Sequence, residues 1–254
     1  MQQTNKLNAN GNRRLPTLDS RLAPTEVHIW RIPLGGEMEA INICRTLLSA
    51  DEVQRSGRFH FERDRQAFII TRAAMRQILG SYGNVAPQDL NFTYGSYGKP
   101  ELSPELDAIK FNLSHSQDIA LLAVTQGLRL GIDIEFVNQD LAVEEIADRF
   151  FSANEVRALG ALAHRQRVEA FFSCWTRKEA YIKALGEGLS VPLGSFDVAF
   201  DANVPAALLH VQNSPGEVSR WSMYDLVTPP TYKAAVVVEG KAHRLRYRKW
   251  NREC

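Results

Sequence analysis

An internal duplication is the feature that most constrains the fold of this chain. Residues 48–53 (LSADEV) resemble residues 151–156 (FSANEV), 103 positions later, and both keep the serine and glutamate spacing of a helix start. Residues 72–80 (RAAMRQILG) match residues 178–186 (KEAYIKALG) at an offset of 106. Both segments have a helical pattern, and we expect each helix to stop at its Leu-Gly pair.

A third match follows in the same order. Residues 120–127 (ALLAVTQG) and 233–240 (KAAVVVEG) are apolar runs that end in glycine, as buried strands do. The three matches predict two similar α+β halves, each with an opening strand, a short helix, a longer helix and a set of strands. We expect a disordered tail over 1–24, an N-terminal half over 25–127 and a C-terminal half over 128–250.

Composition restricts the class of protein. Thirty basic and twenty-nine acidic side chains leave a net charge of +1, so no global field favours nucleic acid or an anionic membrane. No segment has the roughly twenty apolar residues of a membrane helix, and residues 1–24 lack the apolar stretch of a signal peptide. Cys44, Cys174 and Cys254 have no paired spacing, which predicts reduced thiols in a cytoplasmic protein without a zinc site.

One segment invites an RNA-binding interpretation. Residues 58–65 (RFHFERDR) alternate basic and aromatic side chains, as some single-strand binders do. We expect Phe59 and Phe61 to be core residues instead, and Arg55 and Arg63 to contact the phosphates of a small anionic ligand.

A short strand at the start of the second half carries two acids. In residues 131–135 (GIDIE), a period of two places Asp133 and Glu135 on one face and the isoleucines on the other. Two solvated acids on an edge strand would explain the pair alone. The firm apolar face, and Gly131, which permits a close approach, favour a cation site at the junction between the halves.

A third acid lies on the second long helix, residues 175–184 (WTRKEAYIKA). Glu179 and Lys183 occupy positions where the first half has alanine and glutamine, so only the second half carries this chemistry. The alternative is an exposed helical face with ordinary ion pairs. Three carboxylates with Lys178 and Lys183 indicate Mg²⁺ and a pyrophosphate, the lysines reaching phosphate oxygens.

The first half offers further polar candidates. In residues 111–116 (FNLSHS), Ser114 and His115 fit an anion or purine contact, or a turn satisfied by its own side chains. A hydrolase triad is disfavoured because no Gly-x-Ser-x-Gly elbow exists. Residues 97–100 (YGKP) form a rigid turn that can hold Lys99 outward toward a phosphate.

Together these residues resemble the 4'-phosphopantetheinyl transferase superfamily, in its two-halved branch typified by the surfactin-synthetase activator. The Gly-Ile-Asp-Ile-Glu strand and the Trp-x-x-Lys-Glu-x-x-x-Lys helix carry the resemblance. Further matching segments are residues 98–100, 112–116, 149–152 and 188–192. Some members have a His-Arg pair where this chain has Gln66 and Ala67. The resemblance implies two α+β halves related by a pseudo-twofold axis.

The resemblance also implies an activity. It is the transfer of the phosphopantetheine arm of coenzyme A to a serine of an apo acyl or peptidyl carrier protein, with release of adenosine 3',5'-bisphosphate. Asp133, Glu135 and Glu179 would hold Mg²⁺, and Glu179 would also take the serine proton. Ser114 and His115 would contact the adenosine and its 3'-phosphate, with Arg63 and Lys99 as further partners. The fused halves imply a monomer.

Two other functions stay open from the residues alone. A magnesium-dependent phosphohydrolase or nucleotidyl enzyme could use the same acids on another pyrophosphate. A non-catalytic module could hold coenzyme A, although a lapsed site has no chemical reason to keep three acids and Lys183.

Overall fold

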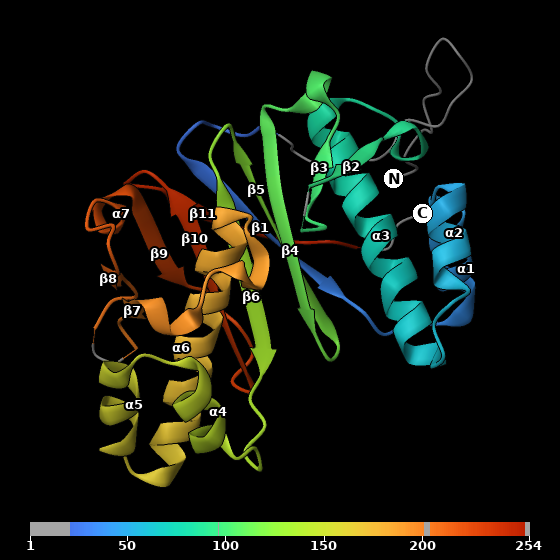
Figure 1. The fold of residues 1–254 in the computed structure, drawn as a ribbon. Coiled ribbons are helices and arrows are strands. Elements are labelled where there is room, and N and C mark those ends of the chain that lie inside the picture. Colours follow the sequence, from blue (N-terminus) through green and yellow to red (C-terminus); the bar gives the residue numbers. More distant parts are fainter. Residues whose placement is uncertain (1–20, 96, 201–203, 252–254) are drawn as a thin grey trace, which may run out of the picture.

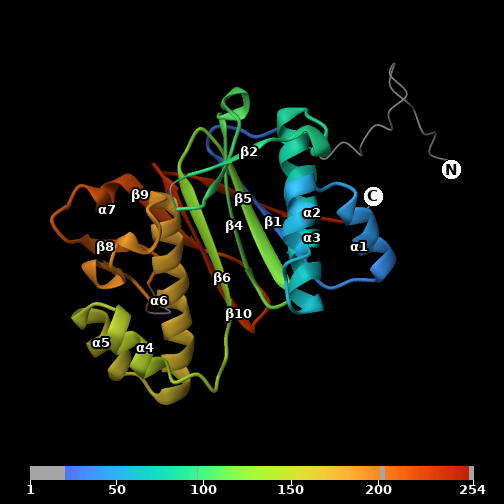
Figure 2. The same ribbon diagram turned by 45° about the vertical axis from the view of Figure 1, so that its right-hand side comes forward.

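Two sheets stack face to face between two groups of helices (Figure 1). The computed structural model describes residues 21–95, 97–200 and 204–251. Helix α3 covers the outer face of one sheet, with α1 and α2 packed on it, and α6 lies against the other, with α4 and α5 beside it (Figure 2). The predicted α+β fold is confirmed, and the sheets form the centre of the molecule.

The two halves repeat the same order of elements. The first contains β1 (Glu26–Pro33), α1 (Met38–Arg45), α2 (Ala50–Ser56), α3 (Glu62–Gly83), β2 (Phe92–Tyr94), β3 (Pro100–Leu102), β4 (Ile109–Ser116) and β5 (Ile119–Gln126). The second contains β6 (Leu130–Phe136), α4 (Val143–Phe150), α5 (Ala153–Gly160), α6 (His164–Leu185), β7 (Phe196–Val198), β8 (Leu208–Val211), α7 (Glu217–Arg220), β9 (Trp221–Asp225), β10 (Tyr232–Glu239) and β11 (Arg244–Lys249). Each half has two short helices before its long one, where the sequence predicted one.

Strand alternation builds the three core layers. In β5, Leu122 and Val124 face the α3 side, whereas Leu121 and Ala123 face the other sheet. In β6, Ile132 and its apolar alternates pack between the sheets, so the intervening residues face α6. The period of two therefore decides that the acids of β6 point toward the second long helix.

A capping box and a buried ion pair recur in both halves. Glu52 in α2 and Glu155 in α5 each accept from the backbone N–H of a capping serine three residues earlier. Each is 2% exposed and pairs with a cation of the long helix that follows. Glu52 contacts Arg76 at 2.7 Å, and Glu155 contacts Lys178 at 2.7 Å. The predicted duplication thus extends to the interior of each half.

The two long helices end differently. Gly186 is the left-handed residue after α6 (φ 76°), as predicted. The predicted stop at Gly80 is wrong, because α3 continues to Gly83 and Asn84 takes the left-handed conformation. Gly80 is needed for another reason: a Cβ there would lie 2.6 Å from the carbonyl oxygen of Val85, where the chain folds back.

The last strand departs from the predicted division into halves. The first sheet has the order β11-β1-β5-β4, and β11 pairs in parallel with β1. Trp250, which follows β11, is 2% exposed in the core under α3, and its indole N–H donates to Gln77 at 2.8 Å. The end of the predicted C-terminal half, residues 128–250, therefore completes the sheet of the first half. β11 covers the edge of β1 that would otherwise expose unpaired backbone groups.

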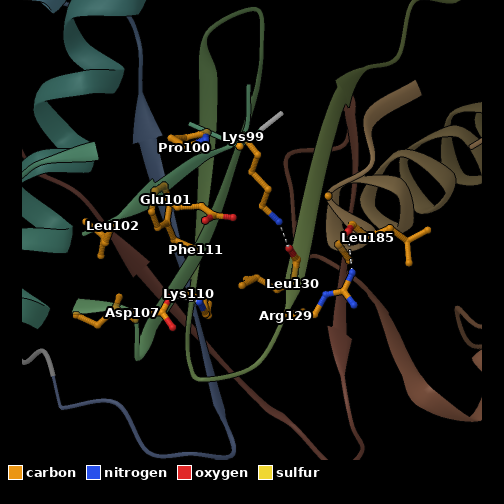
Figure 3. A pocket seen from close by; sticks show the side chains of 14 residues that line it. Lys99, Pro100, Glu101, Leu102, Asp107, Lys110, Phe111, Arg129, Leu130 and Leu185 are labelled. Carbon is orange, nitrogen blue, oxygen red and sulfur yellow. Dashed lines mark hydrogen bonds and ion pairs between the residues drawn. The ribbon is translucent and has the colours of Figure 1, made fainter. Parts of the chain in front are cut away.

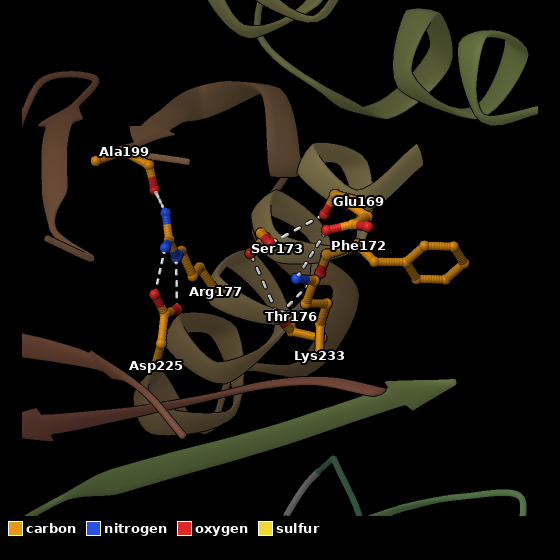
Figure 4. Close-up of polar contacts among 8 residues, drawn as sticks. All are labelled: Glu169, Phe172, Ser173, Thr176, Arg177, Ala199, Asp225 and Lys233. Atoms are coloured by element: carbon orange, nitrogen blue, oxygen red, sulfur yellow. Dashed lines mark hydrogen bonds and ion pairs between the residues drawn. The ribbon is translucent and has the colours of Figure 1, made fainter. Parts of the chain in front are cut away.

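The central part of α6 is fixed to the second sheet and its connections. Arg177, 3% exposed, donates from Nε to Asp225 of β9 at 2.8 Å and also bonds the carbonyl oxygen of Ala199 (Figure 4). About two turns before Arg177, Glu169 forms an ion pair with Lys233 of β10 at 3.4 Å. These contacts hold the helix that carries the third acid against β9 and β10.

Two smaller outcomes concern exposed groups. Phe61 is 64% exposed at the start of α3, so its prediction as a core residue is wrong. Phe59 is only partly buried and lines a cavity.

Among the helices of the described residues, none combines the length and apolar character needed to cross a bilayer. Predicted tail residues 1–20 lie outside the described part of the chain.

Candidate active site

A seam of side chains joins the two halves along β4 and β6. These strands lie at the facing edges of the two sheets and have no backbone pairing with one another. Instead, Asn112 Oδ1 accepts from the backbone N–H of Ile132 at 2.8 Å, and Ser116 Oγ accepts from that of Phe136 at 3.0 Å. Alternate residues of β4 thus replace a strand ladder and fix β6 in register.

The same seam carries the first two acids. Asp133 is 2% exposed, and its Oδ1 accepts from Ser114 Oγ at 2.8 Å and from Lys183 Nζ at 2.6 Å. Its other oxygen, Oδ2, is buried and has no hydrogen-bond partner. Glu135 accepts from Ser116 Oγ at 3.1 Å. A buried carboxylate oxygen without a partner costs free energy. The unpartnered Oδ2 of Asp133 therefore favours binding of a ligand at this position.

Gly131 allows α6 to reach the seam. A Cβ on Gly131 would lie 2.1 Å from the carbonyl oxygen of Ala180 and 2.3 Å from the amide nitrogen of Ala184. The helix backbone therefore lies directly on the strand, as only glycine permits. Glu179 and Lys183, four residues apart on α6, face β6 in consequence, and Lys183 reaches Asp133.

Burial raises the pKa values of all three acids. Burial, and then the Asp133 charge, raise the pKa of Glu135 to about 7. Burial and Asp133 likewise raise the pKa of Glu179. Burial raises the pKa of Asp133 despite the opposing effect of Lys183. Ionising all three carboxyls beside one ammonium group is therefore unfavourable, and a bound cation would relieve that cost.

The carboxylates of this site fit a magnesium ion whose coordination shell is completed by the substrate. Within residues 21–95, 97–200 and 204–251, no three His, Cys, Asp or Glu side chains form a ready metal cluster. Mg²⁺ commonly takes only one or two carboxylates and fills its shell with water and substrate phosphates. Asp133 Oδ2, which has no hydrogen-bond partner, suits that mode of binding, as do the neighbouring carboxyls of Glu135 and Glu179, whose pKa values are raised.

A cavity of about 650 Å³ opens beside the seam, between α3 and β4. The residues that line it are Phe59, Arg63, Asp64, Ala67, Phe68, Thr71, Arg72, Met75, Pro100, Asn112, Leu113, His115 and Gln117. His115 projects from β4 on this side, and burial and then the Lys183 charge lower its pKa. The cavity and the acids therefore lie on the two sides of one edge strand.

The predicted cations of the first half have different surroundings. Arg63 lines the cavity and donates to Gln117 at 2.6 Å, while its side chain stays 63% exposed. Arg55 is exposed, and its guanidinium lies 5.5 Å from the centre of the Phe68 ring at the cavity wall. Both remain predictions as phosphate partners.

Sequence reasoning missed Arg72 and the roles of Asn112 and Ser116. Arg72 is 8% exposed, lines the cavity and donates to Tyr94 at 2.9 Å. Its duplication partner is Lys178, and that match alone could have drawn attention to it. The alternation of small polar residues at 112, 114 and 116 was the available signal for the seam.

The prediction that Lys178 binds a phosphate is wrong in this structure. Its side chain is fully buried, and Nζ pairs with Glu155 and donates to the carbonyl oxygens of Leu193 and Phe196. Positions five apart on a helix point roughly 140° away from each other, so Lys178 and Lys183 cannot share a face. Lys178 is part of the second core.

Two further predictions of coenzyme A contacts do not match the contacts observed. Ser114 donates to Asp133 and does not line the cavity, so it belongs to the acid cluster. Lys99 donates to the carbonyl oxygens of Leu130 and Lys183 and lines a separate cavity of about 290 Å³. Neither polar group points into the space beside α3.

Two family models match separate segments of the chain. A family model described as the 4'-phosphopantetheinyl transferase superfamily matches residues 129–237, and one described as 4'-phosphopantetheinyl transferase, N-terminal, matches residues 36–127. The 4'-phosphopantetheinyl transferase HetI of Nostoc sp. is 39% identical over 221 residues, which cover 86% of this chain and 90% of that protein. The 4'-phosphopantetheinyl transferase Sfp of Bacillus subtilis is 30% identical over 75% of this chain and 82% of its own length.

Among solved structures, similarity covers less of the chain. The holo-[acyl-carrier-protein] synthase of Thermotoga maritima matches with a TM-score of 0.34 and 23% identity, over 45% of this chain and 65% of its own. A complex of ACPS with CoA from Chronobacterium ammoniagenes has a TM-score of 0.34 and 18% identity, over 45% of this chain and 98% of that one.

Proposed function

The chain belongs to the 4'-phosphopantetheinyl transferase superfamily and transfers phosphopantetheine to carrier proteins, and we propose that the seam between its halves is where this happens. Coenzyme A is the donor and a serine hydroxyl of the apo carrier is the acceptor. The serine oxygen bonds to the phosphorus that bears the pantetheine arm. The bond from that phosphorus to the bridging oxygen breaks, and adenosine 3',5'-bisphosphate leaves.

The observation that carries this assignment is the unpartnered, buried Oδ2 of Asp133 between a lysine and two further acids. Asp133, Glu135 and Glu179 would hold Mg²⁺ there. When bound, the ion neutralises charge on the pyrophosphate, which in-line phosphoryl transfer requires. This chemistry explains why the sequence keeps three carboxyls whose mutual repulsion would otherwise destabilise the fold.

Lys183 and Glu179 have complementary roles in the proposed reaction. The Lys183 ammonium group, already 2.6 Å from Asp133, is a fixed positive charge for a pyrophosphate oxygen. Glu179 takes the proton of the carrier serine. Its raised pKa supports this role, because a carboxylate with a pKa closer to neutral is a better general base.

The cavity between α3 and β4 is the proposed site for the adenosine end of coenzyme A. Arg63 and Arg72 offer positive charge, and the aromatic rings of Phe59 and Phe68 offer an apolar wall. His115 is the polar group that faces both this cavity and the charge of Lys183. A ligand that lies across the edge of β4 would place its adenosine here and its pyrophosphate at the acids.

We further propose a cytoplasmic monomer that does not act on nucleic acid. Both sides of the seam belong to one chain, so the site needs no second copy. Cys174 is a buried free thiol, which suits a reducing compartment. The net charge of +1 supports recognition of a small anion and a protein surface over nucleic acid.

Mass spectrometry of an apo carrier tests the proposal. The protein, coenzyme A and Mg²⁺ should add one phosphopantetheine group to the carrier, and should add none to a carrier whose acceptor serine is replaced by alanine. Chelation of the metal and Asp133→Ala should each remove the adduct. No adduct on any of several apo carriers would refute the assignment, and release of inorganic phosphate instead would favour a phosphohydrolase.

A further inference from the structure

Backbone hydrogen bonds and the conformation of Gly98 set the path of the chain at Lys99, in the first half. The backbone N–H of Gly95 donates to the carbonyl oxygen of Lys99 at 3.0 Å, and that of Gly98 donates to Gly95 at 2.8 Å. Gly98 has a φ of 77°, which favours glycine, and Pro100 follows Lys99 directly. The backbone thus fixes the direction in which the Lys99 side chain leaves the turn.

The Lys99 side chain crosses to the second half. Its Nζ donates to the carbonyl oxygen of Lys183 at 2.7 Å and to that of Leu130 at 3.0 Å, and Figure 3 shows it pointing at Leu130. Lys183 is in the last turn of α6, whose carbonyl groups lack helical partners. Arg129 supplements the contact by donating to the carbonyl oxygen of Leu185 at 2.7 Å.

Both acceptors of Lys99 belong to elements that carry the reaction. Lys183 is the residue whose own Nζ binds Asp133, and Leu130 precedes Asp133 by three positions in β6. Beside these acceptors the backbone of α6 lies directly on β6, over Gly131. One ammonium group therefore connects the helix and the strand at the place that sets the distance between Lys183 and Asp133.

The electrostatic surroundings of Lys99 favour a fixed internal donor. Burial, and then the Arg129 charge, lower the pKa of Lys99 to about 8, so most molecules keep the proton at neutral pH. The negative end of α6 attracts such a cation. Two backbone acceptors at hydrogen-bond distance leave the ammonium group turned away from the cavity beside α3, where its neighbour Pro100 is found.

We propose that Lys99 is a positioning residue that holds Lys183 and Asp133 in register, and not a phosphate ligand of coenzyme A. The inference rests on the proposed transferase site and deepens it. Loss of the ammonium group lets the last turn of α6 shift relative to β6. The Lys183 ammonium group then meets the pyrophosphate in a poorer geometry, while the adenosine contacts are unchanged.

The test compares Lys99→Met with Lys110→Met. Lys110 lines the same small cavity, but its ammonium group pairs with Asp107 of the same half. Calorimetric titration with coenzyme A gives its Kd and the fraction of binding-competent protein. Transfer assays then give kcat per competent molecule and KM. A merely structural lysine would lower the competent fraction and leave kcat per molecule unchanged.

For Lys99→Met we expect kcat to fall about 10- to 100-fold, as a displaced catalytic group does. KM and Kd for coenzyme A should stay within about threefold, since ground-state binding is retained. Lys110→Met should resemble the wild type, and Lys99→Arg, which keeps donors for both carbonyls, should restore part of kcat and covers the case in which the methionine variant does not fold.

Two results would overturn the inference. A rise of KM and Kd by tenfold or more at unchanged kcat would make Lys99 a direct ligand, and unchanged values of all three would make it neither. If the wild type shows no transfer, the proposed function fails separately. Hydrogen exchange of the amides at 183–186 and 130–133 then still tests the positioning contact, which predicts faster exchange in Lys99→Met than in Lys110→Met.

Discussion

The long helices of the two halves have the same length, but their side chains have different roles. Both α3 and α6 span 22 residues and follow a helix that begins with a capping box. At one pair of duplicated positions, Gln77 of α3 accepts from Trp250, whereas Lys183 of α6 binds Asp133. At the other pair, Ala73 is fully buried in the core and Glu179 faces the seam. The scaffold recurs in both halves, and the proposed metal ligands and catalytic groups lie in the second.

The strands that oppose these helices differ in the same way. In β1, Trp30 and Ile32 pack under α3 with His28, which bonds Tyr82 of that helix. In β6, the side that faces α6 carries Gly131, Asp133 and Glu135. Two large apolar side chains in the first half thus contrast with two acids in the second, and a glycine brings the helix close enough to reach them.

The largest effect on kcat is expected at the duplicated positions 77 and 183, where the two halves carry different residues. Lys183→Met should lower kcat about 100- to 1,000-fold, because a preorganised charge next to the pyrophosphate is lost. Gln77→Met should leave kcat near the wild-type value and cost about 1–3 kcal/mol of stability, since the Trp250 indole N–H loses its acceptor. Steady-state kinetics and urea unfolding measure the two effects. Equal losses of kcat in both variants would remove the distinction between the halves.

The second test concerns the buried ion pairs of the duplicated glutamates, Glu52 and Glu155. Lys178→Met leaves the Glu155 carboxylate buried without its cation, which should cost about 3–5 kcal/mol in the free energy of unfolding. Arg76→Met should cost less, because Arg72 remains 3.6 Å from Glu52. Both can be measured by denaturant unfolding. For the folded fraction of Lys178→Met we expect an unchanged KM for coenzyme A, and a tenfold rise would restore Lys178 as a phosphate ligand.

The smallest effect is the pH dependence of stability in the metal-free protein. Because folding raises the pKa of Glu135 from 4.5 to about 7, the folded state binds this proton more tightly. The resulting stabilisation is complete below about pH 4.5 and is lost as pH rises toward 7 and beyond. Glu135→Gln should therefore lose less stability than the wild type between pH 5.5 and 8 in chelator. Identical pH slopes in urea unfolding would contradict the crowded carboxyl site.

Much of the fold followed from pattern, because the duplication specifies elements twice. The strand predicted around residues 131–135 is present as Leu130–Phe136, and α6 ends before Gly186 as predicted. The stop at Gly80 failed because that glycine serves a close approach to Val85 instead of a turn. The position of β11 could not be predicted, since its pairing with β1 joins segments far apart in sequence.

The site was predictable where one element's geometry decides it. Periods of two and of 3.6 placed Asp133 with Glu135, and Glu179 with Lys183. The same helical geometry places Lys178 and Lys183 on different faces of α6. The destination of Lys99 depends on a contact between halves, and no local pattern contains that information.

Glu179→Gln tests the central claim, that the second half alone carries the chemistry, most directly. The amide cannot take the serine proton and is a weaker ligand for Mg²⁺, while its size is unchanged. At saturating coenzyme A and Mg²⁺, we expect its single-turnover rate of transfer to an apo carrier to fall at least about 100-fold. A rate near that of the wild type would contradict both roles assigned to Glu179 and leave the acid cluster without a catalytic purpose.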